Sequence, residues 1–197
     1  PDDVTEPTEP EPTESPWVQV AHPKTGELCD VLPEYAELFR LNGDLVGWLE
    51  IPGTVINYPV MQTPDRRDYY LRRNFDGKYS TGGCLYAREE CDVFKPSDNI
   101  TIYGHRMQNG SMFADLGKYK KESFLKEHSI VYFNTLKERH TYQVYAVFLT
   151  DVGYKQNGFY YHNFIDAVDQ TVFDNFTAKC KELALYDTGV EAQLGDK

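Results

Sequence analysis

The sequence has few of the features that define several large protein classes. No window reaches the roughly 18 apolar residues that a membrane-spanning helix needs, and no secretory signal peptide is visible. The chain begins at Pro1 rather than Met, so we expect a trimmed amino end, and a missing anchor is then no evidence of a cytoplasmic protein. Lys and Arg number 20 against 31 Asp and Glu, a net charge of −11. That balance argues against nonspecific nucleic-acid binding, which needs basic side chains to neutralise phosphates.

Cysteine is also scarce, with four residues at irregular spacing: Cys29, Cys84, Cys91 and Cys180. No C-x-x-C pair is present, so a structural zinc site is not expected, and no acidic cluster suggests another metal or a cofactor. A Cys84–Cys91 disulfide and four free thiols both remain open. The G-x-S-x-G motif of serine hydrolases is absent as well.

What the chain does contain begins with an acidic tail. Residues 1–16, PDDVTEPTEPEPTESP, hold six acidic residues and no Lys or Arg. Such a Pro/Glu/Thr segment has little to bury and repels itself, so it is predicted to be disordered and extended. It is either a spacer that separates a membrane anchor or a neighbouring domain from the folded body, or a plain charged tail. We therefore divide the chain into a linker and lead-in over 1–32 and one folded domain over 33–197.

Fifteen Tyr and eleven Phe favour strands, so the fold is predicted to be mainly β with helices (α+β), as a mixed sheet or closed barrel. A short amphipathic helix is expected first, with Tyr35, Leu38, Phe39 and Leu41 facing inward. The predicted helical segments are 33–41, 65–75, 112–118 and 166–183, and the predicted strands are 45–51, 55–61, 82–87, 99–105, 129–136, 140–149 and 189–193.

One strand ends in a candidate catalytic residue. In NITIYGHRMQNGSMF, residues 99–113, His105 follows directly after Gly104, which lets the backbone turn sharply. Histidine titrates near neutral pH and can move protons, although a surface histidine at a turn has the same pattern. No cysteine here is a convincing nucleophile to accompany it. Cys180 falls on the apolar face of its helix, and Cys91 lies among acidic residues that disfavour a thiolate.

A series of motifs gives this histidine a context. VGWLEIPGT, NYPVMQ, YYLRRNF and YGHRM followed by GSMF occur in this order between residues 46 and 113. Together they resemble class B sortases, which are cysteine transpeptidases on the surface of Gram-positive bacteria, and the resemblance extends over residues 33–197. It implies a sortase-type closed β-barrel with an N-terminal helix and a long helix before the last strands. It also implies a protein at the extracellular face of the cell membrane, held by an N-terminal anchor.

By this resemblance His105 corresponds to the catalytic histidine. The family's nucleophilic cysteine ends a TLSTC-like strand and its catalytic arginine lies on the next strand, both just after the segment that matches GDK. We therefore expect a carboxyl end truncated before these strands, with cysteine and arginine beyond Lys197 and the present chain inactive alone. The resemblance also assigns five substrate-groove residues: Asn57, Met61, Tyr103, Tyr160 and Tyr161.

The implied reaction joins two partners. A thiolate attacks the Thr carbonyl of an N-P-x-T-type sorting signal on a secreted protein, and an amine of a peptidoglycan precursor or a pilin then resolves the thioester. No cofactor or metal is needed. Two other functions stay open: a noncatalytic barrel that binds a peptide, and a cysteine protease that uses water in place of the amine.

Overall fold

The computed structural model of the chain describes residues 16–150 and 159–195. The acidic tail that was predicted to be disordered lies almost entirely outside these ranges. Within them, no helix combines the length and the apolar character needed to cross a membrane.

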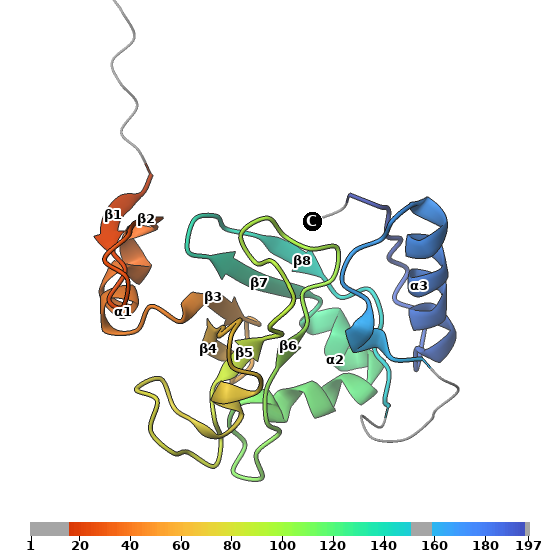
Figure 1. Cartoon of the computed structure of the whole chain (residues 1–197). Helices are drawn as coiled ribbons and strands as arrows, with labels where there is room; N and C mark the ends of the chain where they lie inside the picture. The colour runs from red at the N-terminus through yellow and green to blue at the C-terminus, as the bar shows by residue number, and fades with distance from the viewer. Residues whose placement is uncertain (1–15, 151–158, 196–197) are drawn as a thin grey trace, which may run out of the picture.

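The centre of the molecule is a six-stranded mixed sheet in the order β6-β5-β4-β3-β7-β8 (Figure 1). Only β4 and β5 run parallel, and the other neighbours are antiparallel. The α+β prediction is therefore confirmed. The strands are β3 (Leu45–Glu50), β4 (Asn57–Met61), β5 (Leu85–Ala87), β6 (Ile102–Tyr103), β7 (Ile130–Thr135) and β8 (Thr141–Gln143).

Strand β3 is buried on both faces and separates two apolar clusters. Leu45 packs into one cluster, while Val46 and Leu49 pack into the other. Gly47 lies so close to β7 that a Cβ atom would be 2.3 Å from the backbone oxygen of Asn134. The middle of the sheet therefore requires glycine at this position for the two strands to pair.

An N-terminal hairpin covers one end of the sheet. β1 (Val18–Ala21) and β2 (Leu28–Val31) pair antiparallel, and the 3-10 helix η1 (Pro33–Tyr35) and helix α1 (Ala36–Leu41) follow. Val31 is 0% exposed within the same cluster as Leu45. The predicted lead-in therefore contains ordered, packed structure, and the folded body begins before residue 33. Within the confirmed helix, Leu41 is 76% exposed, so its predicted inward position is wrong.

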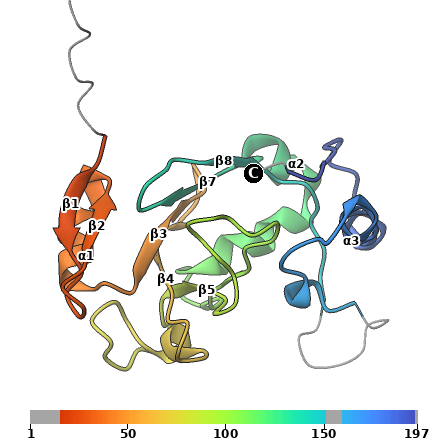
Figure 2. The ribbon, with the colours of Figure 1, turned by 45° about the horizontal axis from the view of Figure 1, so that its top comes forward.

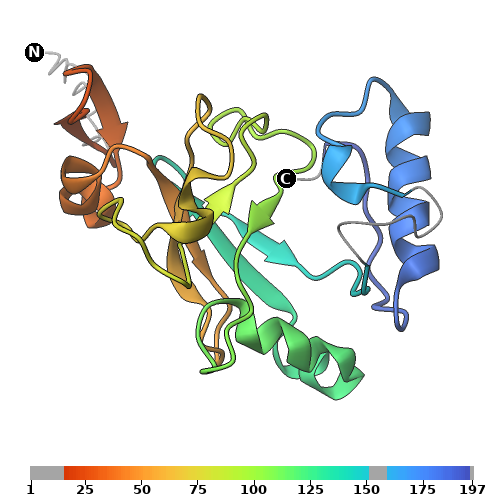
Figure 3. The same cartoon turned by 60° about the horizontal axis from the view of Figure 1, so that its bottom comes forward.

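The remaining helices lie away from this hairpin. η2 (Tyr69–Arg72) confirms the predicted turn, and η3 (Phe113–Lys120) with α2 (Glu122–Glu127) packs against the sheet. Helix α3 (Gln170–Leu183) stands at the end of the molecule opposite the hairpin (Figure 3). It begins later than predicted because the Asp169 carboxylate accepts a hydrogen bond from the amide of Val172 and caps it. Val168, inside the predicted helical range 166–183, precedes the helix and is 87% exposed.

Three of the predicted strands are much shorter than their patterns or irregular, and of 99–105 only Ile102–Tyr103 is a strand. Of 140–149 only Thr141–Gln143 is a strand, and residues 189–193 are irregular. The segment after β8 instead pairs with the end of α3, because Leu185 donates its amide to the Val147 carbonyl at 2.8 Å. Tertiary contact with the helix thus replaces the predicted strand pairing.

The sheet curls into half a barrel (Figure 2), with β6 and β8 as its edge strands. Ile102 on β6 and Tyr142 on β8 both line a cavity of about 300 Å³ on the inner face. The curl therefore brings the two edge strands toward one shared cavity, which has both apolar and polar lining residues.

The hairpin offers a matched stability test, because Val18 and Val31 are partners in its register. Val31→Ala should lower the free energy of unfolding by roughly 1–3 kcal/mol, since it removes buried methyl groups and leaves a cavity. Val18→Ala, at a side chain 38% exposed, should cost less than about 0.5 kcal/mol. Urea denaturation of both variants measures the difference, and equal losses would show that the hairpin is not part of the core.

Candidate active site

The candidate site lies at one edge of the sheet, where three strands start or end. β4 and β5 run parallel and so begin at the same edge, and antiparallel β6 ends there. Asn57 is the first residue of β4, while Gly104 and His105 directly follow β6. The topology therefore brings residues that are about fifty positions apart to the same edge.

Gly104 sets where the histidine emerges. A Cβ atom at this position would lie 2.3 Å from Leu85 and 2.6 Å from Phe113. The sequence analysis assigned Gly104 to a sharp backbone turn, but it is not among the residues with positive φ. Its function in the fold is close packing between β5 and η3.

The loop after the histidine is tightly held. The His105 carbonyl accepts the Phe113 amide at 3.0 Å, and Arg106 and Met112 form an antiparallel bridge. Met112 has a φ of 56°, a left-handed conformation that is costly for a side chain of this size. Its amide donates to the hydroxyl of Tyr58 at 3.1 Å, which links the loop to β4. The backbone at His105 is thus held by β6, which it directly follows, and by β4 through the Met112–Tyr58 hydrogen bond.

The His105 side chain is half-buried and faces the segment before β5. Its Nε2 lies 3.0 Å from the backbone oxygen of Leu71 in η2. This contact holds the ring in one orientation while part of the imidazole stays accessible. A partly exposed, oriented imidazole at a strand end is suited to proton transfer.

Two of the predicted groove residues flank this edge. Asn57 is exposed, and its side-chain oxygen accepts a hydrogen bond from the Trp48 indole. Tyr103, two residues before His105, is half-buried with its ring 5.3 Å from that of Tyr86. Burial raises the pKa of its hydroxyl, so it stays protonated at neutral pH. Both positions are compatible with contact to a bound peptide.

Met61 is different. It lies at the far end of β4 from Asn57 and is 0% exposed, within the cluster that contains Leu45 and Tyr86. Its side chain has no surface to offer to a peptide. The prediction for Met61 is therefore wrong, and the residue is part of the core.

Tyr160 and Tyr161 reach the site from a distant part of the sequence. Tyr161 lines an apolar cavity of about 550 Å³ together with Gly104 and Arg106, which flank the histidine. Tyr160 is 48% exposed, with its ring 6.0 Å from that of His162. Tyr161 is thus brought beside the histidine strand, and Tyr160 stands next to it on the surface.

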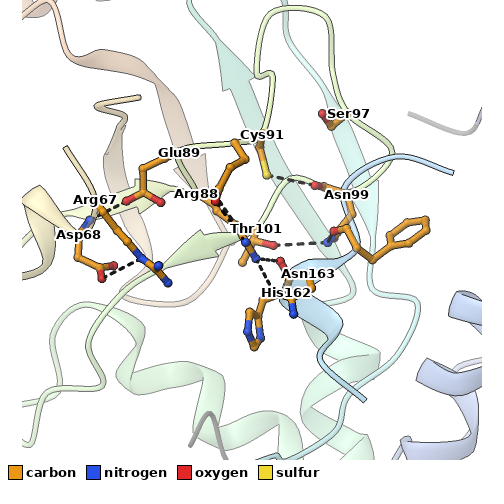
Figure 4. A network of polar contacts seen from close by, with 12 residues as sticks. Arg67, Asp68, Arg88, Glu89, Cys91, Ser97, Asn99, Thr101, His162 and Asn163 are labelled. Atoms are coloured by element: carbon orange, nitrogen blue, oxygen red, sulfur yellow. Dashed lines mark hydrogen bonds and ion pairs between the residues drawn. The ribbon is translucent and has the colours of Figure 1, made fainter. Parts of the chain in front are cut away.

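A polar network binds this segment to Arg88, directly after β5, and to Asn99, shortly before β6 (Figure 4). The Arg88 guanidinium donates to the His162 carbonyl and, at 3.2 Å, to the side-chain oxygen of Asn163. Asn99 donates through its side-chain amide to the Phe164 carbonyl at 2.7 Å. Neither Arg88 nor Asn99 was predicted as a site residue. Their partners are more than sixty residues away, and no local sequence pattern indicates them.

No described thiol is activated. All four cysteines are free, and Cys84, Cys91 and Cys180 are buried. Burial raises the pKa of each thiol, to about 11 for Cys84 and for Cys180. Over the residues that the structure covers, no group of three or more His, Cys, Asp or Glu side chains is placed to hold a metal ion. The only described feature suited to catalysis at this edge is therefore the histidine.

Comparison with known proteins identifies the family and the fold. The family model described as Sortase domain matches residues 49–184, so the chain belongs to the sortase family. Its relatives are class B members. Sortase B of Listeria monocytogenes is 32% identical over 168 residues, and sortase B of Staphylococcus aureus is 31% identical over 120 residues. The chain is thus a class B sortase sequence.

Solved structures agree with this assignment. Sortase B from Bacillus anthracis in complex with AAEK1 has a TM-score of 0.75 and 31% identity, covering 93% of this chain and 79% of that one. The S. aureus sortase B–substrate complex has a TM-score of 0.77 and 25% identity, covering 85% and 74%. The matches to these two curated relatives include 85% and 61% of this chain. They span only 65% and 49% of the relatives' own length.

The Arg88 network can be tested by hydrogen exchange. Arg88→Ala should speed amide exchange over residues 161–167 by about tenfold or more, because it removes two of the bonds that dock this segment. Arg67→Ala is the control, since the Arg67 side chain is 85% exposed and only pairs with Asp68 at 3.8 Å. Mass spectrometry of peptides from both variants gives the rates. Similar exchange in the two would mean that Arg88 does not hold the segment.

The buried thiols give a pH-dependent prediction. With a pKa of about 11, Cys84 and Cys180 hold little thiolate at neutral pH, so alkylation should be slow there. The rate should rise about tenfold per pH unit up to that pKa, because the thiolate fraction rises in that proportion. Iodoacetamide labelling of the folded protein followed by peptide mapping measures each site. Fast labelling of either residue at pH 7 would contradict its assignment as inert.

Proposed function

We propose that the protein is a cysteine transpeptidase that cleaves an N-P-x-T-type sorting signal and joins the Thr carbonyl to an amine. The observation that carries the proposal is an oriented, half-buried His105 at the end of β6 in a chain of the sortase family. No other described group at this edge is suited to move a proton at neutral pH.

In this reaction His105 acts as the general acid. The attacking thiolate forms a thioester, and the protonated imidazole gives its proton to the amine that leaves. A positioned acid of this kind contributes roughly 10²–10⁴-fold to the rate. The same imidazole, now neutral, takes a proton from the amine that resolves the thioester.

The nucleophilic cysteine and the catalytic arginine are assigned to residues outside these 197. This assignment is supported by the chemistry of the site, because the buried cysteines have raised thiol pKa values. β6 is an edge strand of the described sheet, so a strand added parallel to it would end next to His105. An arginine there would supply positive charge where the oxyanion develops. We expect the 197 residues alone to be inactive.

The substrate and location follow from the same family membership. The sorting-signal peptide would lie against Asn57, Tyr103, Tyr160 and Tyr161, and the amine would come from a peptidoglycan precursor or a pilin. That one relative was solved as a sortase B–substrate complex supports a peptide partner. The proposed location is the outer face of the cell membrane, with the protein held by an N-terminal anchor. The Gram-positive sources of the curated relatives support this proposal.

The acid role predicts a large effect of His105→Ala in the full-length protein. Its kcat on an N-P-x-T peptide should fall by more than about a hundredfold, because the leaving amine is no longer protonated. The control is His128→Ala, which removes a similarly accessible imidazole that contacts the Pro52 carbonyl at 2.8 Å. That variant should keep kcat within about threefold.

The outcomes separate the three functions. Amine-dependent ligation that is lost in His105→Ala supports transpeptidation, whereas release of peptide at a rate unchanged by added amine would identify a hydrolase. Peptide binding without any turnover by the full-length protein would identify a noncatalytic binding barrel. Full activity in His105→Ala would refute the acid role.

A further inference from the structure

The contact between His105 and Leu71 fixes which ring nitrogen carries a hydrogen. Nε2 lies 3.0 Å from the Leu71 backbone oxygen. A carbonyl oxygen has only lone pairs and accepts hydrogen bonds, so the hydrogen must be on Nε2. When the ring is neutral, its second nitrogen, Nδ1, is then the one with the free lone pair.

We propose that Nδ1 is the atom through which His105 gives and takes its proton, and that the Leu71 carbonyl, held in place by Gly83, is the device that positions it. This inference deepens the proposed function and rests on it for the reaction. The geometry that carries it does not depend on a substrate.

The Leu71 carbonyl is the middle one of three that face the segment before β5. The carbonyl of Tyr70 accepts the Cys84 amide at 3.1 Å, and the carbonyl of Arg72 accepts the Ser80 amide at 3.0 Å. The Arg72 guanidinium also donates to the Thr81 carbonyl at 2.8 Å. With both neighbours bonded, the peptide groups on either side of Leu71 have little freedom to rotate.

Gly83 completes this arrangement. Its φ is +60°, and a Cβ atom there would lie 2.5 Å from the oxygens of both Leu71 and Tyr70. Real Cβ atoms do not approach a carbonyl oxygen so closely, so any side chain at this position would push the Leu71 carbonyl away. Gly83 is therefore a positioning residue that acts on His105 through Leu71.

The histidine is held equally well from the other side. Its own carbonyl accepts the Phe113 amide, and Gly104 is packed between Leu85 and Phe113. Since Nε2 is already used, Nδ1 is the nitrogen that remains to reach a substrate. The described part of the chain offers it no hydrogen-bond partner.

The proton balance of the proposed reaction is then specific to one atom. As the thiolate forms the S–C bond, the scissile C–N bond breaks and the Nδ1 proton passes to the leaving nitrogen. His105 is left neutral with its hydrogen on Nε2, bonded to Leu71. When the new C–N bond forms and the S–C bond breaks, Nδ1 takes one proton from the incoming amine, which restores the imidazolium.

The first test reads the tautomer directly. The full-length protein is labelled with ring-¹⁵N histidine, and His105 is assigned by its absence from the His105→Ala spectrum. At a pH where the ring is neutral, the ¹⁵N shifts should show a protonated Nε2 and an unprotonated Nδ1. An unprotonated Nε2 in the folded protein overturns the inference, even if transpeptidation is observed.

The second test moves the carbonyl. Gly83→Ala should give a mixture of the two tautomers and lower kcat for peptide ligation by at least about tenfold, with KM changed by less than about twofold. The matched control is Gly26→Ala, because Gly26 has a φ of +75° but nothing within 4 Å of its Cβ position. It introduces the same type of backbone strain without touching the site, so tautomer and kcat should stay unchanged.

The tests separate this inference from the proposed function. A pure Nε2–H tautomer and an unchanged kcat in folded Gly83→Ala would overturn the positioning role. If Gly83→Ala does not fold, the wild-type tautomer still decides the question. If the wild type has the expected tautomer but does not ligate peptides, only the proposed function fails.

Discussion

The close approach of Gly104 to Leu85 and Phe113 is the constraint on which the candidate site depends. It ends β6 at the sheet edge and allows η3 to pack directly against the strand. The loop from His105 to Met112 is closed by a backbone hydrogen bond, because Phe113 donates its amide to the His105 carbonyl. A side chain at position 104 would separate these elements and move the histidine. Core packing and the geometry of the candidate site are therefore set by the same contact.

The sheet performs two tasks with its two faces. The outer face packs against the N-terminal hairpin and the segment around Tyr70, while the inner face of the curl bears a mainly apolar lining. His105 emerges between them, with Leu71 on one side and the cavity lined by Tyr161 nearby. The sheet thus places an oriented imidazole beside an apolar cavity.

The candidate site is assembled from separate stretches of the chain, and these are not all held by the same physical means. The Leu71 carbonyl is positioned by backbone hydrogen bonds and by the absence of a side chain at Gly83. The segment with Tyr161 is held by the charged side chain of Arg88 and by the amide of Asn99. Backbone bonds fix the histidine, whereas side-chain bonds fix the tyrosines. The segment that carries Tyr160 and Tyr161 is therefore the part of the site that a single substitution can most readily detach from the sheet.

The sequence by itself determined the class of fold, the strands with strong alternation and the family, because these depend on local patterns and on a specific series of motifs. The catalytic role of His105 stays a prediction. It did not determine the short extent of β8, the burial of Met61 or the roles of Leu71, Gly83, Arg88 and Asn99. These depend on which distant segments meet. The residues after β8 bond to the segment that follows α3, and Met61 lies where the hairpin packs on the sheet. Only the tertiary structure decides such contacts, since a residue's partner across the fold leaves no periodic signal in its own neighbourhood.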